Sequence, residues 1–259
     1  MTRVKKKYRK KKRKSIIKSR YFLIFLISLI SSLFFGSILL VDSFYELEVV
    51  EIEGANLTSS GSLRNFVRNK SKINFIVESD SLVFTSIKNL EKEILDAYPH
   101  IEKVDLKKIF PETIHVKITE REKEAIWCMG PESVNDCFKI DSQGIAFEKI
   151  NKSENFNIFY QLPGNIELGS RVLPFRKIDF IFEAKEKMEE SFELKKMVIP
   201  HERSLFIKTA IGFEIRVDFE DELEDQIERL EILLEEEIDD VETLEYIELR
   251  YGNSVYYKN

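Results

Sequence analysis

Residues 21–41 form a continuous apolar stretch without a charged residue or a proline. A helix of this length spans about 30 Å, because each residue adds about 1.5 Å, and the hydrocarbon core of a bilayer has the same thickness. The apolar part of a cleaved signal peptide is shorter, about 7 to 15 residues, and ends in small residues. The stretch therefore predicts an uncleaved transmembrane helix.

After this stretch, some segments have the apolar spacing of a strand and others have the apolar spacing of a helix. Residues 46–54 alternate as a strand with one buried face. Two helices should follow, one carrying Leu63 with Thr58 or Ser59 as its cap, and one from Ile87 to Leu95 with Ser86 as its cap. Strands at 101–109 and 114–118 complete the order β-α-α-β-β. We expect an antiparallel sheet with both helices on one face.

The remaining chain, residues 122–259, predicts a larger domain. Strand patterns lie at 125–129, 137–141, 145–147, 194–199, 204–209, 213–219, 244–250 and 254–258. Helix patterns lie at about 175–190 and at 221–234, where the expected buried stripe is Leu223, Ile227, Leu230 and Leu234. Gly252-Asn253 between the last two strands is a hairpin signal. The fold class is thus α+β, with a mixed sheet and helices packed on one of its faces.

Charge is divided unevenly between the two sides of the apolar stretch. Twelve Lys and Arg residues and no acidic residue lie at positions 1–20, whereas the rest of the chain holds 28 basic against 46 acidic residues. Basic residues flanking a first transmembrane helix stay in the cytoplasm, so we expect an N-terminus inside and a C-terminal domain outside the cell membrane. An acidic domain also argues against nucleic-acid binding, which depends on neutralising phosphates.

Cys128 and Cys137 are the two cysteines, and they lie on neighbouring predicted strands. Outside the cytoplasm a disulfide between them is expected, with buried free thiols as the alternative. Two thiols without a histidine nearby do not complete a zinc site.

Sequence motifs give no sign of catalysis. The chain contains no HExxH, GxSxG, P-loop or GxGxxG pattern, and its three histidines are scattered. We therefore expect no enzymatic activity, no cofactor, no metal and no small-molecule substrate.

The stretch YPHIEKVDLKKIFPETIHVKITERE, residues 98–122, resembles the end of a POTRA domain in the form used by the bacterial cell-division family FtsQ/DivIB. The residues that carry this motif are Pro99, Pro111, Glu120 and Arg121, followed by Ala125 and Trp127. Lys123 departs from the pattern, where the family favours proline. The closing segment also resembles the end of that family, with Glu248 in place of its usual aspartate.

This resemblance implies a domain plan and a function. The plan is a cytoplasmic polybasic tail (1–20), a transmembrane helix (21–41), a POTRA domain (44–121) and an FtsQ/DivIB-type β domain (122–259). The implied function is a non-enzymatic divisome scaffold at the septum, which binds FtsB/DivIC-type and FtsL-type coiled-coil membrane proteins. The alternative is a membrane-anchored envelope enzyme or a POTRA-type polypeptide-transport component.

The last strand is the expected binding element. A strand at a sheet edge presents unpaired N–H and C=O groups to which a partner can add a strand. By position in the family, the residues that would contact the partner are Arg250, Tyr251, Val255 and Tyr257, with Tyr256 as a neighbour on the opposite face. The alternative is that these tyrosines only complete the core.

Overall fold

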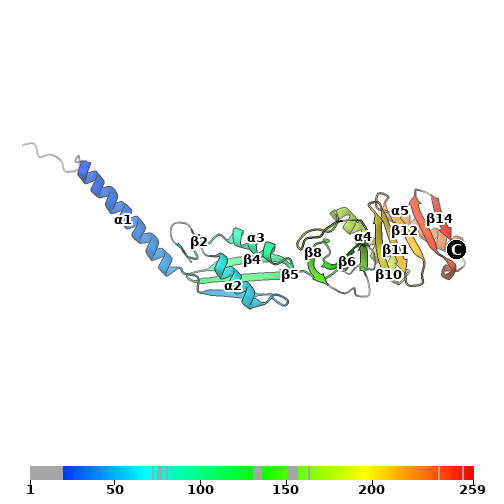
Figure 1. Ribbon diagram of the computed structural model, residues 1–259, viewed down its shortest axis with the longest axis horizontal. Coiled ribbons are helices and arrows are strands. Elements are labelled where there is room, and N and C mark those ends of the chain that lie inside the picture. The colour runs from blue at the N-terminus through cyan, green and yellow to red at the C-terminus, as the bar shows by residue number, and fades with distance from the viewer. Residues whose placement is uncertain are drawn as a thin grey trace, which may run out of the picture.

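The computed structural model describes residues 20–71, 73–74, 78–79, 81–83, 85–130, 136–150, 157–162, 164–238, 240–252 and 254–259. The polybasic tail up to residue 19, the loop at 131–135 and Asn253 of the closing turn lie outside the described residues. Figure 1 shows an elongated molecule: a single helix, a small domain and a larger domain follow one another along its long axis.

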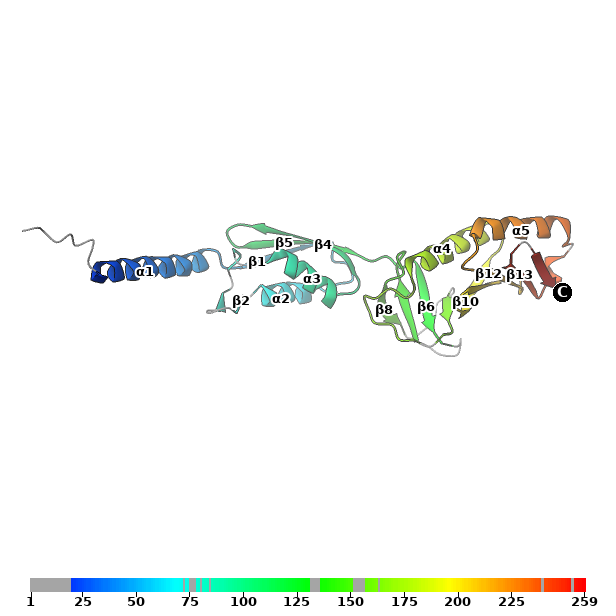
Figure 2. The same ribbon diagram turned by 90° about the horizontal axis from the view of Figure 1, so that it is seen from above.

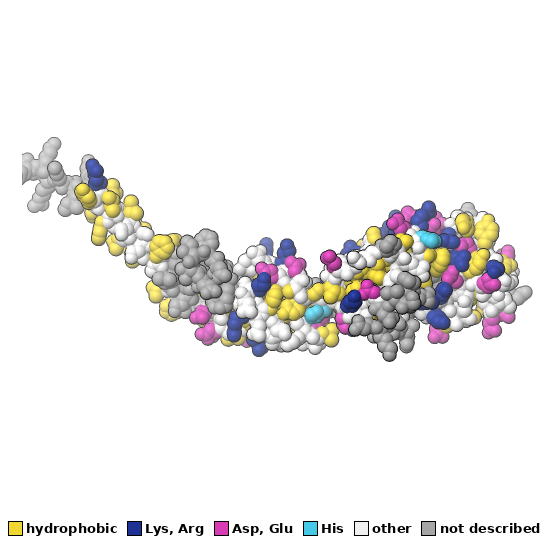
Figure 3. All heavy atoms as spheres, viewed as in Figure 1, with side chains coloured by type: hydrophobic (Ala, Val, Ile, Leu, Met, Phe, Trp, Pro, Cys, Tyr) yellow, Lys and Arg dark blue, Asp and Glu magenta, His cyan; other side chains and the backbone are white. Residues whose placement is uncertain are grey.

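Helix α1 (Arg20–Phe44) contains the apolar stretch. Its segment Arg20–Ser37 has a mean hydropathy of 1.7 and is not buried by any other part of the protein, so it is long and apolar enough to cross a membrane. Hydrophobic side chains cover it along its length (Figure 3). The structure confirms the predicted helix as a candidate membrane span.

The small domain contains a three-stranded sheet with two helices on one face (Figure 2). Its strands are β1 (Val49–Glu53), β4 (Ile101–Ile109) and β5 (Thr113–Glu120), and its helices are α2 (Ser60–Lys70) and α3 (Ile87–Ala97). Leu63 of α2 and Ile94 of α3 are fully buried against Val116 of β5. The helical and the alternating patterns therefore meet in one core, as expected.

The expectation of an antiparallel sheet was wrong for one of its two strand pairs. The sheet order is β1-β5-β4, in which β4 and β5 form an antiparallel hairpin but β1 runs parallel to β5. The chain crosses from β1 through both helices before it enters β4, and β5 then returns between β4 and β1 in the direction of β1. The sequence also gave no signal for a short hairpin between the helices, β2 (Ile73–Asn74) and β3 (Glu78–Ser79).

The helix caps also differ from the expectation. Ser59 and Ser86 occupy the N-cap positions of α2 and α3, but neither side chain makes a capping hydrogen bond. Thr58 is directed elsewhere, because its hydroxyl donates to Glu120.

The large domain is built on a nine-stranded sheet of order β14-β13-β12-β11-β10-β9-β6-β7-β8. The strands are β6 (Ala125–Met129), β7 (Asp136–Ile140), β8 (Ala146–Ile150), β9 (Asn157–Tyr160), β10 (Leu194–His201), β11 (Ser204–Thr209), β12 (Glu214–Asp218), β13 (Tyr246–Tyr251) and β14 (Ser254–Lys258). A 3-10 helix η2 (Val241–Thr243) precedes β13. Strand β9 was not predicted, and it pairs in parallel with both β6 and β10.

Helices α4 (Phe175–Glu189) and α5 (Leu223–Glu236) cover one face of this sheet (Figure 2). The buried stripe of α5 was only partly predicted: Leu223 and Leu230 are buried, but Gln226 and Leu233 complete the stripe, while Ile227 and Leu234 are half-buried. Gln226 is tolerated in the core because its amide accepts from the backbone N–H of Asp218 and donates to the carbonyl of Asp218, both at 2.9 Å.

The opposite face of the sheet carries the disulfide. Cys128 of β6 and Cys137 of β7 face each other in the antiparallel pair and are bonded through their sulfurs. The disulfide packs with Ile126, Phe159 and Val198 in a small apolar cluster. The structure thus contains the expected disulfide and not the alternative of free thiols.

Candidate protein-binding edge

Strand β14 is the last strand of the large sheet. It pairs with β13 on one side, and among the described residues no strand pairs with its other side. The strand stands at the far end of the molecule from α1 (Figure 1). Its outer side therefore presents backbone groups along five residues, a length of about 17 Å.

The pairing register divides the predicted binding residues between two faces. Tyr257 lies opposite Ile247, which is fully buried beneath the helices, so Tyr257 and Val255 belong to the helix-covered face. Tyr256 lies opposite Glu248 on the uncovered face. The structure thus brings Tyr251 and Tyr256 together and separates them from Val255 and Tyr257.

Tyr251 and Tyr256 form an exposed aromatic pair on the uncovered face. Their ring centroids are 5.9 Å apart with the rings nearly perpendicular. Both side chains are largely solvent-exposed, at 61% and 56%. Val255, in contrast, is half-buried against the main core. The two tyrosines are therefore not needed to complete the core, whereas Val255 contributes to it.

Arg250 is held in place by neighbours that the sequence did not identify. Its Nε and Nη2 donate to the two carboxylate oxygens of Glu248 at 2.5 and 2.6 Å, and its Nη1 donates to the hydroxyl of Ser204 at 2.9 Å. The guanidinium also lies over the ring of Phe206, 5.1 Å from its centroid. The hydrogen bonds with Glu248 raise the pKa of Arg250 and outweigh the opposing effect of burial.

A second arginine extends this arrangement along the uncovered face. The guanidinium of Arg216 lies between two rings, 4.1 Å from the centroid of Tyr246 and 5.0 Å from that of Phe206. It also approaches Glu248 at 3.6 Å. Glu248 is buried, where an unpaired charge would be costly, and the two arginines balance its negative charge. The face beside β14 is thus a layer of alternating arginine and aromatic side chains.

The four residues of the predicted POTRA motif lie in the small domain, away from this edge. Glu120 accepts hydrogen bonds from the backbone N–H groups of Leu57 and Thr58 at 2.9 and 2.8 Å, and from the Thr58 hydroxyl at 2.8 Å. Burial raises the pKa of Glu120, but these bonds together outweigh it, so the pKa lies below its ordinary value. Glu120 therefore fixes the loop that leads into α2.

Arg121 and the two prolines have structural positions as well. The Nε of Arg121 donates to the carbonyl of Pro99 at 3.0 Å, and its Nη1 contacts Asp141 of the large domain. Pro111, which follows a cis peptide bond, lies in the turn between β4 and β5. Pro111 therefore lies at one end of the small domain, whereas Pro99, Glu120 and Arg121 lie at the end that adjoins the large domain.

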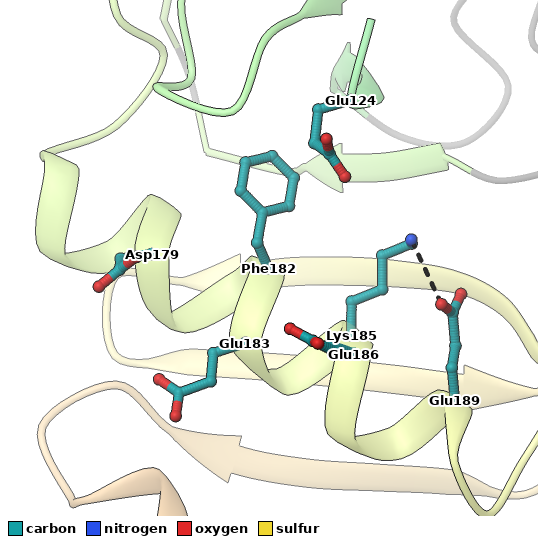
Figure 4. Close-up of a pocket in the computed structure, with 7 residues that line it drawn as sticks. All are labelled: Glu124, Asp179, Phe182, Glu183, Lys185, Glu186 and Glu189. Atoms are coloured by element: carbon teal, nitrogen blue, oxygen red, sulfur yellow. Dashed lines mark ion pairs between the residues drawn. The ribbon is translucent and has the colours of Figure 1, made fainter.

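A hollow along α4 is lined mostly by acidic residues. It is lined by Glu124, Asp179, Phe182, Glu183, Lys185, Glu186 and Glu189. Figure 4 shows the carboxylates of Asp179 and Glu183 pointing away from that of Glu189, which pairs with Lys185 at 3.3 Å. Within the described part of the chain, no three His, Cys, Asp or Glu side chains are grouped as metal ligands.

Comparison with known proteins gives one family match. Residues 46–121 match the family model described as "POTRA domain, FtsQ-type". These residues contain all of β1, α2, α3, β4 and β5. A search of curated proteins found no significant match. The family match confirms the resemblance noted in the sequence, and an apolar helix followed by this domain is consistent with the FtsQ/DivIB family.

Proposed function

Because the chain carries an FtsQ-type POTRA domain behind a helix fit to span a membrane, we propose that it is a non-enzymatic scaffold of the bacterial divisome. In this proposal α1 anchors it in the cytoplasmic membrane as a single-pass protein, with the N-terminus in the cytoplasm. The POTRA domain and the β domain (residues 122–259) stand outside, at the septum.

We further propose that β14 is the docking site for the coiled-coil partners. An FtsB/DivIC-type protein, paired with an FtsL-type protein, would add a strand to β14 and link the scaffold to septal wall synthesis. The observation that carries this proposal is the unpaired outer side of β14 beside an exposed tyrosine pair. Backbone hydrogen bonds would supply affinity, and aromatic contacts would supply specificity.

The side chains of the uncovered face suit this role because they are already ordered. Arg250 and Arg216 are fixed by Glu248 and by ring contacts, so little side-chain entropy is lost when a partner covers them. Tyr251 and Tyr256 are large, rigid and exposed, and such aromatic residues often dominate binding energy.

Hydrogen exchange on the full chain in detergent, with and without the purified coiled-coil pair, tests strand addition directly. We expect the backbone amides of residues 254–258 to become protected when the pair binds. Binding that leaves these amides unprotected would refute β14 as the docking strand.

Substitution of the exposed tyrosines provides a second test of the docking site. Tyr251→Ala combined with Tyr256→Ala should weaken binding by a factor of ten or more, since each truncation at such a contact costs about 1–2 kcal/mol. Ile211→Ala is the matched control, because Ile211 is similarly exposed in the turn between β11 and β12 of the same domain. Equal binding by the double variant and by the control would count against the tyrosines.

A further inference from the structure

The turn between β4 and β5 exposes three apolar residues in succession. Ile109, Phe110 and Pro111 are all solvent-exposed, with Ile109 at 50% and Phe110 at 56%. A tight turn is normally polar, and consecutive exposed apolar residues usually have a functional reason. None of the three contributes to the core of the POTRA domain.

This turn is fixed beside the end of α1. The rings of Phe110 and Tyr45 are in perpendicular contact, with centroids 5.7 Å apart. The carbonyl of Glu112 accepts from the backbone N–H groups of Glu48 and Val49 at 3.0 and 3.1 Å. Leu40, Phe44 and Tyr45 line an apolar groove together with Pro111. Figure 2 shows the β4–β5 turn directed toward the end of α1.

The position of the β4–β5 turn relative to the bilayer follows from the length of α1. The apolar stretch ends at residue 41, so Phe44 lies about 4–5 Å beyond it along the helix axis. The headgroup layer on each side of the hydrocarbon core is about 5–7 Å thick. With α1 across the bilayer, Phe44, Tyr45 and the adjoining Phe110 would lie at the level of the headgroups, where aromatic rings are favoured.

We propose that the β4–β5 turn is a second membrane contact, in which Ile109 and Phe110 insert into the headgroup layer of the bilayer that holds α1. The inference rests on the membrane anchor of the proposed function. Charged groups beside the turn have both signs, with Lys107 paired to Asp105 at 3.3 Å and Glu112 following Pro111. Apolar insertion, rather than attraction to anionic lipid, therefore drives the contact, and a zwitterionic bilayer is sufficient.

The contact restricts the POTRA domain. A domain joined to a helix by a few residues would otherwise tilt freely, whereas a second attachment point limits that motion. Thus the anchor and the turn together would set the orientation of the POTRA domain relative to the membrane surface.

Environment-sensitive fluorescence on the full chain tests the proposal. The native cysteines are joined in the disulfide, so a single added cysteine can be labelled with a nitrobenzoxadiazole probe. Phe110→Cys and Ile109→Cys report on the turn, Leu33→Cys reports on the helix, and Ile211→Cys is the remote control of similar exposure. Each labelled protein is reconstituted into phosphatidylcholine vesicles that contain no quencher, lipid with a nitroxide on the headgroup, or lipid with a nitroxide deep in the acyl chain.

We expect the headgroup nitroxide to quench most of the fluorescence at positions 109 and 110, the acyl-chain nitroxide to quench position 33, and neither to change position 211. Quenching at position 33 without quenching at 109 and 110 overturns the second contact and leaves the anchor intact. A blue shift at 110 without quenching also overturns it, since that result indicates contact with a second copy of the chain. Absence of quenching at 33 refutes the anchor and the inference with it.

Discussion

Arg121 and Asp141 join the POTRA domain to the β domain. Arg121 follows β5 and also donates to the carbonyl of Pro99, while Asp141 follows β7. Asp141 is buried, and its other carboxylate oxygen accepts from the backbone N–H groups of Gln143 and Ile145 at 3.0 and 2.9 Å. Each partner is thus anchored within its own domain before the pair forms.

Arg121→Ala should therefore destabilise the junction strongly. It leaves the buried Asp141 carboxylate without its cation, which costs about 3 kcal/mol for a pair of this kind. Denaturant unfolding of the full chain measures the loss. Lys117→Ala is the matched control, because Lys117 pairs with Glu53 at 3.1 Å in an exposed position and should cost under about 1 kcal/mol. Similar losses in the two variants would contradict the role given to Arg121.

Glu120 should make stability depend on pH. Because the pKa of Glu120 is lowered in the folded protein, its stabilisation is complete above the unfolded pKa of about 4.3. It is lost as the pH falls through the lower, folded pKa. We expect Glu120→Gln to reduce the free energy of unfolding by about 1–3 kcal/mol at pH 7. The difference from wild type should shrink below about pH 4; a constant difference would refute the assignment.

Glu248 should be more important for stability than an exposed carboxylate. Glu248→Ala leaves Arg250 without its two-point partner and leaves Arg216 without one of its carboxylates. We expect a loss of about 2–4 kcal/mol. Glu248→Asp shortens the side chain and should lose the two-point contact at a smaller cost. A double-mutant cycle with Arg250→Ala separates the pair from the individual side chains.

Replacing both Cys128 and Cys137 with alanine should lower the free energy of unfolding by about 2–3 kcal/mol, since the bridge closes a short loop. Thermal unfolding of the oxidised, the reduced and the doubly substituted protein measures the effect. The reduced wild type should resemble the variant. A reduced protein as stable as the oxidised one would show that the small apolar cluster alone holds β6 and β7 together.

Local patterns in the sequence predicted the elements that depend on neighbouring residues. The β4–β5 hairpin, the facing cysteines and the closing hairpin were all visible, because alternation and turn residues fix pairing over short separations. The parallel pairing of β1 with β5 was not visible, because it joins residues more than 60 positions apart. Strand β9 was missed because its first three residues are all buried, so it shows no alternation of apolar and polar positions.

The proposed binding edge shows the same limit. The resemblance of the closing segment pointed to Arg250 and the tyrosines, but not to Phe206 or Arg216, which come from β11 and β12. Phe206 and Arg216 lie beside Arg250 only because the sheet places β11, β12 and β13 next to one another, and this strand order cannot be derived from local sequence patterns. Glu248 was noted only as a departure from the family pattern, although its carboxylate binds Arg250 at two points and approaches Arg216.

The position of β9 has a consequence for how the β domain fails under load. Strands β6, β7 and β8 form one set and β10 to β14 form another, and among the described strands β9 alone pairs with both sets. The first set stands next to the POTRA domain and the second carries the free edge (Figure 1). A pull between the membrane and a docked partner would thus load the backbone hydrogen bonds of β9 together with the apolar core beneath α4, which both sets share.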